Sequence, residues 1–155
     1  MTVIVGIVTE HGAIMGADRA VSDTYVKLTM GEPKIRDFDG RLIGYAGSIT
    51  VGRAIFRMIE RDQPTNLVEY VEQATLAKPM SGAAFLIIEN QELWEIEAGA
   101  AIRLEANYSA IGSGLQYALG SLYRWHSNLE DLRTALNAAE HFAPDVRGPM
   151  VIITA

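Results

Sequence analysis

The chain opens with apolar runs that are separated by turn signals. Residues 3–9 form a β-branched, apolar run, and the Glu10-His11-Gly12 sequence that follows is typical of a turn. Residues 13–17 form a second short apolar run. Two strand-like runs joined by such a turn predict a β-hairpin at the start of the chain.

A second hairpin is predicted further along. Residues 34–38 and 42–46 read as strands on either side of Asp39-Gly40, a dipeptide that favours tight hairpin turns. The stretch between the two hairpins, residues 18–31, is polar and mixed. It therefore predicts a loop, with one possible strand around Tyr25.

The apolar period then changes from two residues to about 3.6, the repeat of an α-helix. One apolar stripe predicts a helix that is interrupted at Pro64, and its members are Val51, Ala54, Ile55, Met58 and Ile59. Asn66, with Glu69 three residues later, is typical of the start of a second helix, which extends to about Leu76. The Lys-Pro-Met-Ser-Gly segment at 78–82 breaks that helix.

The rest of the chain repeats this order of strands followed by two helices. Ser113 and Gln116 fit the capping-box pattern at the start of one helix. Ser127 and Glu130 fit it at the start of the next, which extends to about residue 140. The predicted strands around these helices lie at 83–88, at 92–97, more weakly at 102–104, and at 150–154.

Several of these strands are apolar on both faces, so both faces must be covered. Examples are VIVGIV near the start, AAFLII in the middle and MVII near the end. Two stacked sheets with helices outside would satisfy this pattern, and so would a single sheet between two helix layers. A length of 155 residues without a repeat or linker predicts one domain, 1–155.

The composition and the net charge exclude some kinds of site and make some classes of partner less favourable. The chain contains no cysteine, which excludes disulfides, cysteine-based zinc sites and a cysteine nucleophile. Its 13 basic and 19 acidic residues give a net charge of −6, so the overall charge does not favour nucleic acid or an anionic membrane. No apolar run approaches the ~20 residues of a transmembrane helix, and no basic leader is present, so we expect a cytoplasmic protein.

Three other features have ordinary structural explanations. The histidines show no metal-ligand spacing, so neither a metal nor a cofactor is predicted. Gly112-Ser113-Gly114 could hold a phosphate, but the rest of a nucleotide-binding motif is missing. One basic helix stripe is either a solvated face or a subunit contact. It consists of Arg53, Arg57 and Arg61.

Thr2 stands directly after Met1 and before a strand that is predicted to be buried. If Met1 is removed, Thr2 carries a hydroxyl and a free α-amine on one residue. An α-amine has a pKa near ~7.7–8.0, so it can act as a general base at neutral pH. Thr2 is therefore a candidate nucleophile with its own base attached.

Four phrases follow the opening MTVIVGIVTEHG in order: ADRAVSD at 17–23, Lys34-Ile35, LIGYAGS at 42–48 and AIGSG at 110–114. Together they resemble the proteasome β-subunit and HslV-type peptidase family, whose members are N-terminal nucleophile (Ntn) hydrolases. The resemblance covers nearly the whole chain. HslV is the more similar, because the chain is short and the AIGSG phrase is shared. The resemblance implies an α+β fold, a four-layer αββα sandwich.

The same resemblance implies catalytic roles for five residues. Thr2 would match the nucleophile, and Lys34 the buried lysine whose positive charge lowers the pKa of the attacking system. Asp18 would match the acid that pairs with this lysine and keeps it charged. The backbone N–H of Gly47 would form the oxyanion hole, and Ser113 would hydrogen-bond near the Thr2 amine and help proton transfer.

A looser match concerns substrate binding. Four positions fall near those that shape the specificity pocket in this family, namely Val21, Ser22, Tyr45 and Ile49. The chain departs from the family pattern at Ala20, where proteasome subunits usually carry an arginine. Residues 145–148, Asp-Val-Arg-Gly, are only loosely similar to the family's segment near the active site, so no role is assigned to Asp145.

The leading hypothesis is a threonine endopeptidase that acts on peptides or unfolded proteins. The resemblance implies a homo-oligomeric ring that encloses the active sites, with a possible ATP-dependent unfoldase as partner. Two alternatives stay open: an Ntn amidohydrolase for small molecules, and a non-catalytic proteasome-like subunit that retains Met1. With Met1 retained, Thr2 has no free amine and the chain should be inactive.

Overall fold

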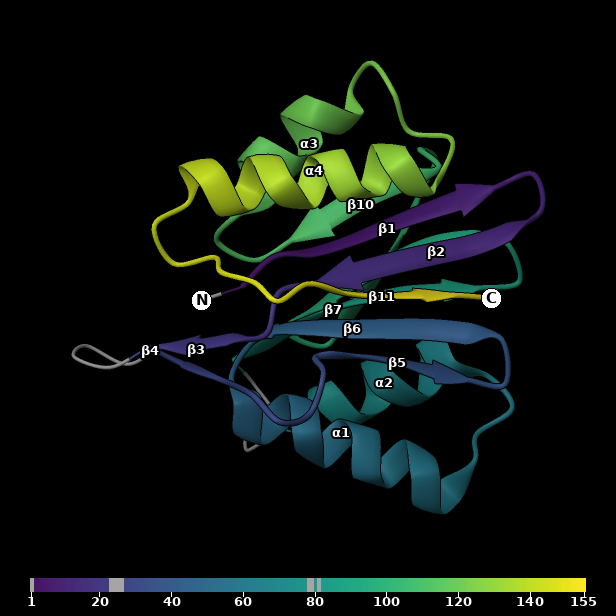
Figure 1. Ribbon diagram of the computed structural model, residues 1–155. Helices are drawn as coiled ribbons and strands as arrows, with labels where there is room; N and C mark the ends of the chain where they lie inside the picture. Colours follow the sequence, from purple (N-terminus) through teal and green to yellow (C-terminus); the bar gives the residue numbers. More distant parts are fainter. Residues whose placement is uncertain (1, 23–26, 78–79, 81) are drawn as a thin grey trace.

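Two β-sheets are stacked face to face in the computed structural model, and a pair of helices covers the outer face of each sheet (Figure 1). The structure describes residues 2–22, 27–77, 80 and 82–155. Strands that are apolar on both faces fit this stack, because one face meets the other sheet and the opposite face meets helices. The predicted αββα sandwich is confirmed, and the single sheet that the pattern also allowed is not formed.

The first sheet is antiparallel, with the strand order β10-β1-β2-β11. Its centre is the hairpin predicted at the start of the chain, in which Ile4 pairs with Ala17. Strand β10 is missing from the predicted elements, because its residues form a strand only by pairing with β1, about a hundred residues earlier in the chain. The strands are β1 (Ile4–Thr9), β2 (Gly12–Ala17), β10 (Tyr108–Ile111) and β11 (Val151–Thr154).

The second sheet is also antiparallel and follows the chain order, β5-β6-β7-β8-β9. Its strands are β5 (Ile35–Phe38), β6 (Arg41–Gly47), β7 (Ala83–Glu89), β8 (Glu92–Glu97) and β9 (Ala100–Leu104). The β5–β6 pair is the second predicted hairpin. A separate ribbon consists of β3 (Ala20–Ser22) and β4 (Lys27–Thr29). Tyr25, where a strand was predicted, lies outside the described residues.

Helices α1 and α2 pack on the second sheet, and helices α3 and α4 on the first (Figure 1). Their bounds are α1 (Ile49–Asp62), α2 (Leu67–Thr75), α3 (Leu115–Leu122) and α4 (Leu129–Phe142). Helix α2 begins as predicted, because the Asn66 side chain accepts a hydrogen bond from the N–H of Glu69 at 2.9 Å. Among the described helices, none is long and apolar enough to cross a membrane.

Two of the predicted helix starts are wrong. Helix α3 starts after Gly114 with no side-chain cap, because the Ser113 hydroxyl bonds to another part of the chain. Helix α4 does have a capping box, but it lies one residue later than predicted. Asn128 is the N-cap and Asp131 is its partner, while Ser127 bonds to Asp131 from outside the helix.

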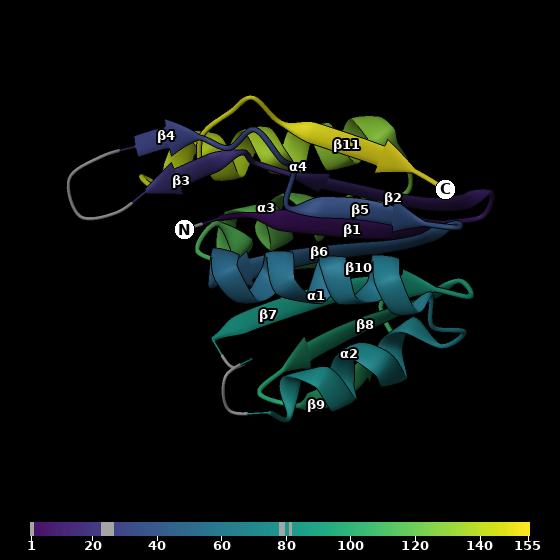
Figure 2. The same ribbon diagram turned by 90° about the horizontal axis from the view of Figure 1, so that it is seen from below.

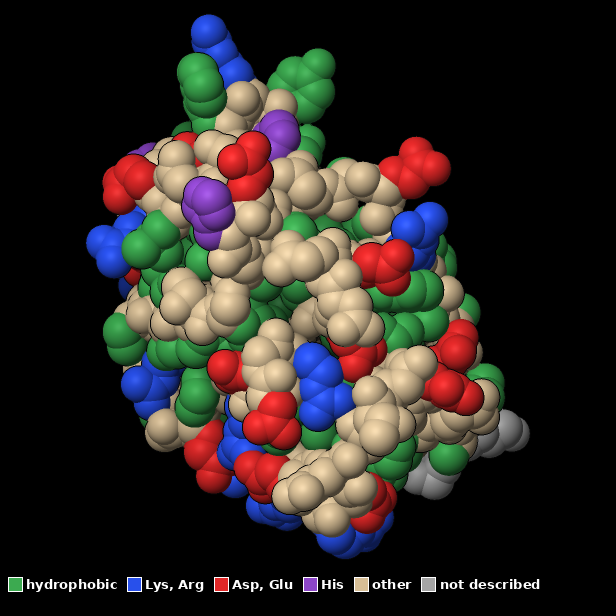
Figure 3. Space-filling model, turned by 90° about the vertical axis from the view of Figure 1, so that its right-hand side faces the viewer, with side chains coloured by type: hydrophobic (Ala, Val, Ile, Leu, Met, Phe, Trp, Pro, Cys, Tyr) green, Lys and Arg blue, Asp and Glu red, His purple; other side chains and the backbone are tan. Residues whose placement is uncertain are grey.

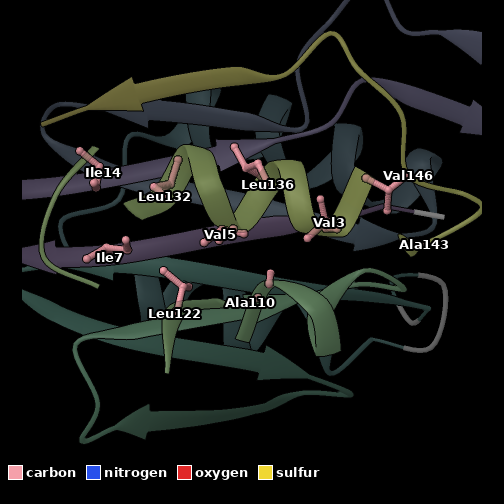
Figure 4. Close-up of a cluster of buried hydrophobic side chains, with 13 residues drawn as sticks. Val3, Val5, Ile7, Ile14, Ala110, Leu122, Leu132, Leu136, Ala143 and Val146 are labelled. Carbon is pink, nitrogen blue, oxygen red and sulfur yellow. The ribbon is translucent and has the colours of Figure 1, made fainter. Parts of the chain in front are cut away.

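Side chains alternate across β1, and this alternation sorts them into different layers. Val3, Val5 and Ile7 pack with the residues of α3 and α4, as Figure 4 shows. Ile4 instead packs between the two sheets. A third apolar layer, which includes Tyr45, lies between the second sheet and α1 and α2. These three buried layers hold the four-layer stack together.

One edge of the stack gathers segments from distant parts of the sequence. Strands β6 and β10 both run toward this edge, and α1 and α3 begin there; the N-terminus and the β3–β4 ribbon lie at the same edge (Figures 1 and 2). The side that faces the viewer in Figure 3 is the opposite one, where acidic and basic side chains are interspersed. The N-terminal edge is therefore the place where strand ends and helix starts can combine into a site.

Glu89, at the end of β7, is a buried carboxylate that joins the second sheet to α2. Its oxygens accept hydrogen bonds from the backbone N–H groups of Leu67 at 2.9 Å and Val68 at 3.2 Å. The Nη1 atom of Arg41 lies 3.7 Å from its Oε1. Glu89 thus satisfies N–H groups that the start of a helix leaves without partners.

We expect Glu89→Ala to lower the free energy of unfolding by about 2–4 kcal/mol, because two hydrogen bonds to a charged group disappear and Arg41 loses the carboxylate near it. Glu92→Ala is the matched control. Glu92 pairs with Arg103 near the surface at 3.2 Å, so its loss should change the stability by less than about 1 kcal/mol. Urea denaturation measures both, and equal losses would contradict the role given to Glu89.

Candidate active site

Thr2 lies just before β1, where the start of α3 fixes its backbone. Its carbonyl oxygen accepts hydrogen bonds from the N–H of Gly114 at 3.2 Å and from the hydroxyl of Ser113 at 3.3 Å. Its nitrogen donates to Ser113 Oγ at 3.2 Å. The loop can come this close because Gly112 has a φ of +96°, and because a Cβ there would clash with the Thr2 carbonyl group.

The side chain of Lys34 reaches Thr2 from the second sheet. Lys34 precedes β5, and its Nζ donates to Thr2 Oγ1, to Asp18 Oδ1 at 3.1 Å and to the carbonyl oxygen of Ala20 at 2.6 Å. An ammonium group has three N–H donors, so each of them has an acceptor here. Thr2, Asp18 and Lys34 are 3%, 0% and 2% exposed, which places the whole contact out of water.

Asp18 follows β2 and ties this cluster to the backbone. Its Oδ1 also accepts a hydrogen bond from the N–H of Val3 at 3.0 Å, and its Oδ2 accepts one from the N–H of Ala20 at 3.2 Å. A buried carboxylate is unfavourable unless its charge is paired and its oxygens are hydrogen-bonded. Asp18 meets both conditions, and it thereby links Lys34 to the starts of β1 and β3.

Burial lowers the pKa of Lys34 below the usual lysine range, because desolvation disfavours the charged form. The charge of Asp18 and its hydrogen bond to Lys34 oppose this shift. An ammonium group that donates to Thr2 Oγ1 stabilises negative charge on that oxygen. The arrangement can therefore activate the hydroxyl of Thr2, provided that a base removes its proton.

A cavity of about 140 Å³ opens beside Thr2 and Lys34. Its other lining residues are Ala20, Val21, Tyr45, Gly47 and Ile49. Gly47 ends β6 with a φ of +95°, and a Cβ on it would lie only 2.5 Å from the Gly82 carbonyl oxygen. Glycine is therefore required at this position, and its exposed backbone faces the same cavity as Thr2.

Three of the four predicted specificity positions line this cavity: Val21, Tyr45 and Ile49. The side chain of the fourth, Ser22, lies outside the described part of the structure. Tyr45 forms a fixed wall, because its ring packs edge-on against Phe56 with the ring centroids 5.2 Å apart. It also lies so close to α1 that only a glycine fits at position 52. The cavity beside Thr2 is therefore small and rigid on this side.

All five residues predicted to be catalytic meet at this edge, while their roles stay predictions. The contacts that the sequence did not predict are those of the Ala20 backbone. Ala20, noted as a departure from the family pattern, contributes its carbonyl to Lys34 and its N–H to Asp18. The side chain of the neighbouring Arg19 bonds elsewhere, to the carbonyls of Met30 and Gly31. No side-chain pattern signals such backbone partners.

The remaining candidates do not join this cluster. In the basic stripe of α1, Arg53 pairs with Glu32 at 3.0 Å, and Arg61 pairs with its neighbour Asp62 at 2.6 Å. Within the residues that the structure describes, no group of three or more His, Asp or Glu side chains is placed to hold a metal. In the loosely matching segment 145–148, Val146 is buried and packs near Gly114.

Comparison with known sequences gives one informative relative. No protein-family model matches the chain. The chain is 26% identical over 172 aligned positions to a proteasome subunit beta from Parafrankia sp. (strain EAN1pec), and the match covers 93% of this chain. The chain spans 63% of the length of that relative.

Comparison with solved structures addresses the fold. Eukaryotic HslV from Trypanosoma brucei matches with a TM-score of 0.83 and 19% identity, over 99% of this chain and 98% of that one. BPH from Thiobacillus denitrificans, in complex with epoxomicin, matches with a TM-score of 0.80 and 19% identity, over 98% and 97%. At such identities the structures establish the fold alone. Sequence and fold together confirm the predicted resemblance to the proteasome β-subunit and HslV-type family: the chain is similar in sequence to a proteasome β subunit and has the fold of HslV.

Proposed function

We propose that this chain is a threonine endopeptidase of the proteasome/HslV type, with Thr2 as its nucleophile after removal of Met1. The observation that carries the proposal is the pair of hydrogen bonds at Thr2. Its Oγ1 accepts a hydrogen bond from Lys34, and its nitrogen donates one to Ser113. Met1 lies outside the described residues. Its removal would turn the Thr2 nitrogen from an amide into a free amine.

In the proposed reaction the α-amine of Thr2 is the general base, with an ordinary pKa of ~7.7–8.0. It takes the proton from Oγ1 while Oγ1 forms a bond to the carbonyl carbon of the substrate. The C–N bond then breaks, the proton passes from the ammonium to the leaving amine, and an ester remains on Oγ1. Water attacks the ester with the help of the same amine and releases the acid.

Four neighbours would support these steps. The Lys34 ammonium donates to Oγ1 while negative charge develops on it, and Asp18 keeps that ammonium protonated despite its burial. Ser113 orients the Thr2 nitrogen, and the N–H of Gly47 stabilises the negative charge on the substrate oxygen.

We further propose a homo-oligomeric ring that encloses the sites, with peptides or unfolded proteins as substrates and a possible ATP-dependent unfoldase as partner. The support is the match to a proteasome subunit. The two alternatives, a small-molecule amidohydrolase and a non-catalytic subunit that retains Met1, are separated by the first experiment below.

We expect Thr2→Ala to lower peptide hydrolysis at least about a thousandfold, because the attacking oxygen is lost. Thr2→Ser keeps both the hydroxyl and the amine, so it should retain measurable activity. Fluorogenic peptides report the rates, and intact mass reports removal of Met1 and a covalent adduct with epoxomicin.

Unchanged hydrolysis by Thr2→Ala would rule out the mechanism. Hydrolysis of small amides without any cleavage of peptides would favour the amidohydrolase. An intact mass that includes Met1, with no adduct and no hydrolysis, would favour the non-catalytic subunit.

The lowered pKa of Lys34 predicts how the rate depends on pH. The protonated form is the active one, so the rate should fall on the alkaline side below the usual lysine pKa of about 10.4. Asp18→Asn removes the charge that raises this pKa, so the alkaline limb should move to lower pH. Asp37→Asn is the control. Asp37 is an exposed residue of β5 that accepts a hydrogen bond from the N–H of Gly40, so its substitution should leave the alkaline limb in place. If the alkaline limb of the pH–rate profile lies at the same pH in the wild type and both variants, the ionisation of Lys34 does not determine it.

The cavity of about 140 Å³ predicts which residue the enzyme accepts on the acyl side of the scissile bond. A cavity of about 150 Å³ just holds benzene, so alanine, valine or leucine should fit and tryptophan should not. Ile49→Phe should fill the cavity and lower kcat/KM for leucine roughly tenfold more than for alanine. Thr50→Phe places the same ring at the exposed next position and should leave this ratio unchanged. Equal ratios in both variants would contradict the assignment.

A further inference from the structure

A second and larger cavity, of about 610 Å³, lies between the two sheets. It is built by the ends of β7, β8 and β10 and by the first turns of α3. Its walls are mainly apolar and include Phe85, Ile96, Ile111, Leu115 and Leu119. Its size lies within the range of about 300–1,000 Å³ that is usual for ligand pockets. Neither the fold nor the five predicted catalytic roles account for it.

Two glycines link this cavity to the surroundings of Thr2. Gly47 lines both this cavity and the smaller one. Gly112 also lines the larger cavity, and it contacts the carbonyl group of Thr2. The two cavities are therefore neighbours along the N-terminal edge of the stack.

The chemistry of the proposed reaction indicates which part of a substrate would enter each cavity. The acyl carbonyl has to lie between Thr2 Oγ1 and the backbone of Gly47, which line the small cavity. The leaving amine takes its proton from the Thr2 nitrogen, and that nitrogen is held by Ser113, next to Gly112. The leaving side of the substrate therefore departs toward the large cavity.

We propose that the large cavity binds a large apolar side chain of the substrate residue directly after the scissile bond. The inference rests on the proposed function and names the substrate class of that site. The carboxylate of Glu95 lines the cavity, where the Ser109 hydroxyl donates to it at 2.5 Å. An acidic substrate residue is thus repelled. The expected order of preference is phenylalanine or leucine, then alanine, then aspartate.

Internally quenched peptides that differ only in the residue after the scissile bond test this inference. We expect kcat/KM to be at least about tenfold higher for phenylalanine than for alanine in the wild-type protein. Leu119→Glu places a charge in the wall, and Ala84→Leu fills the cavity from β7; each should lower this ratio several-fold. Both positions are half-buried, so at least one of the variants should fold. Leu129→Glu, at the start of α4 and outside the cavity, should keep the wild-type ratio.

A wild-type ratio near one, or a ratio that neither cavity variant changes, would overturn the inference. Failure of the proposed function looks different, because formation of an adduct on Thr2 needs only the nucleophile and no leaving group. A protein that forms no adduct on Thr2 lacks the nucleophile itself, whereas an adduct without preference on the leaving side contradicts only the second cavity's role.

Discussion

Lys34 and Asp18 form an ion pair that is closed off from water, and the N-terminal edge of the molecule is organised around it. Such a pair is tolerated only when the remaining donors and acceptors are satisfied as well. Here Lys34 Nζ reaches Thr2 and the Ala20 carbonyl, while Asp18 accepts the N–H groups of Val3 and Ala20. These bonds hold two segments in place, the start of the chain at residues 2–3 and the start of β3 at Ala20. The ion pair and the path of the chain around it therefore depend on each other.

The αββα stack makes this arrangement possible, because no single element could supply it. Thr2 and Asp18 flank the β1–β2 hairpin of the first sheet, whereas Lys34 precedes β5 of the second. The sheets pack through small and apolar side chains. At Gly44, for example, a Cβ would lie 2.6 Å from Ile4 of the other sheet. Close packing of the sheets thus brings a lysine from one sheet to a hydroxyl at the start of the other.

The sequence predicted most of the fold, because period and turn chemistry are local properties. Both N-terminal hairpins and the four helices follow from them. Strand β10 was not predicted, since Tyr-Ser-Ala-Ile forms a strand only by pairing with β1, which lies about a hundred residues earlier. The choice between one sheet and two also depends on long-range packing. Only the family resemblance resolved it in advance.

In the candidate site, a local pattern at Ser113 led to a wrong prediction, because a long-range contact decides what its side chain does. The capping-box pattern predicts that Ser113 caps the helix, which would stabilise α3 by about 1 kcal/mol. In the structure its hydroxyl bonds to the nitrogen and carbonyl of Thr2, and α3 starts at Gly114 without a side-chain cap. A tertiary contact has replaced a favourable local one. Departures from local rules of this kind are typical of functional or strained sites, which fits the proposed active site. The missing cap at Ser113 and the burial of Lys34 therefore both mark the surroundings of Thr2 as the candidate site. Neither observation depends on comparison with a relative.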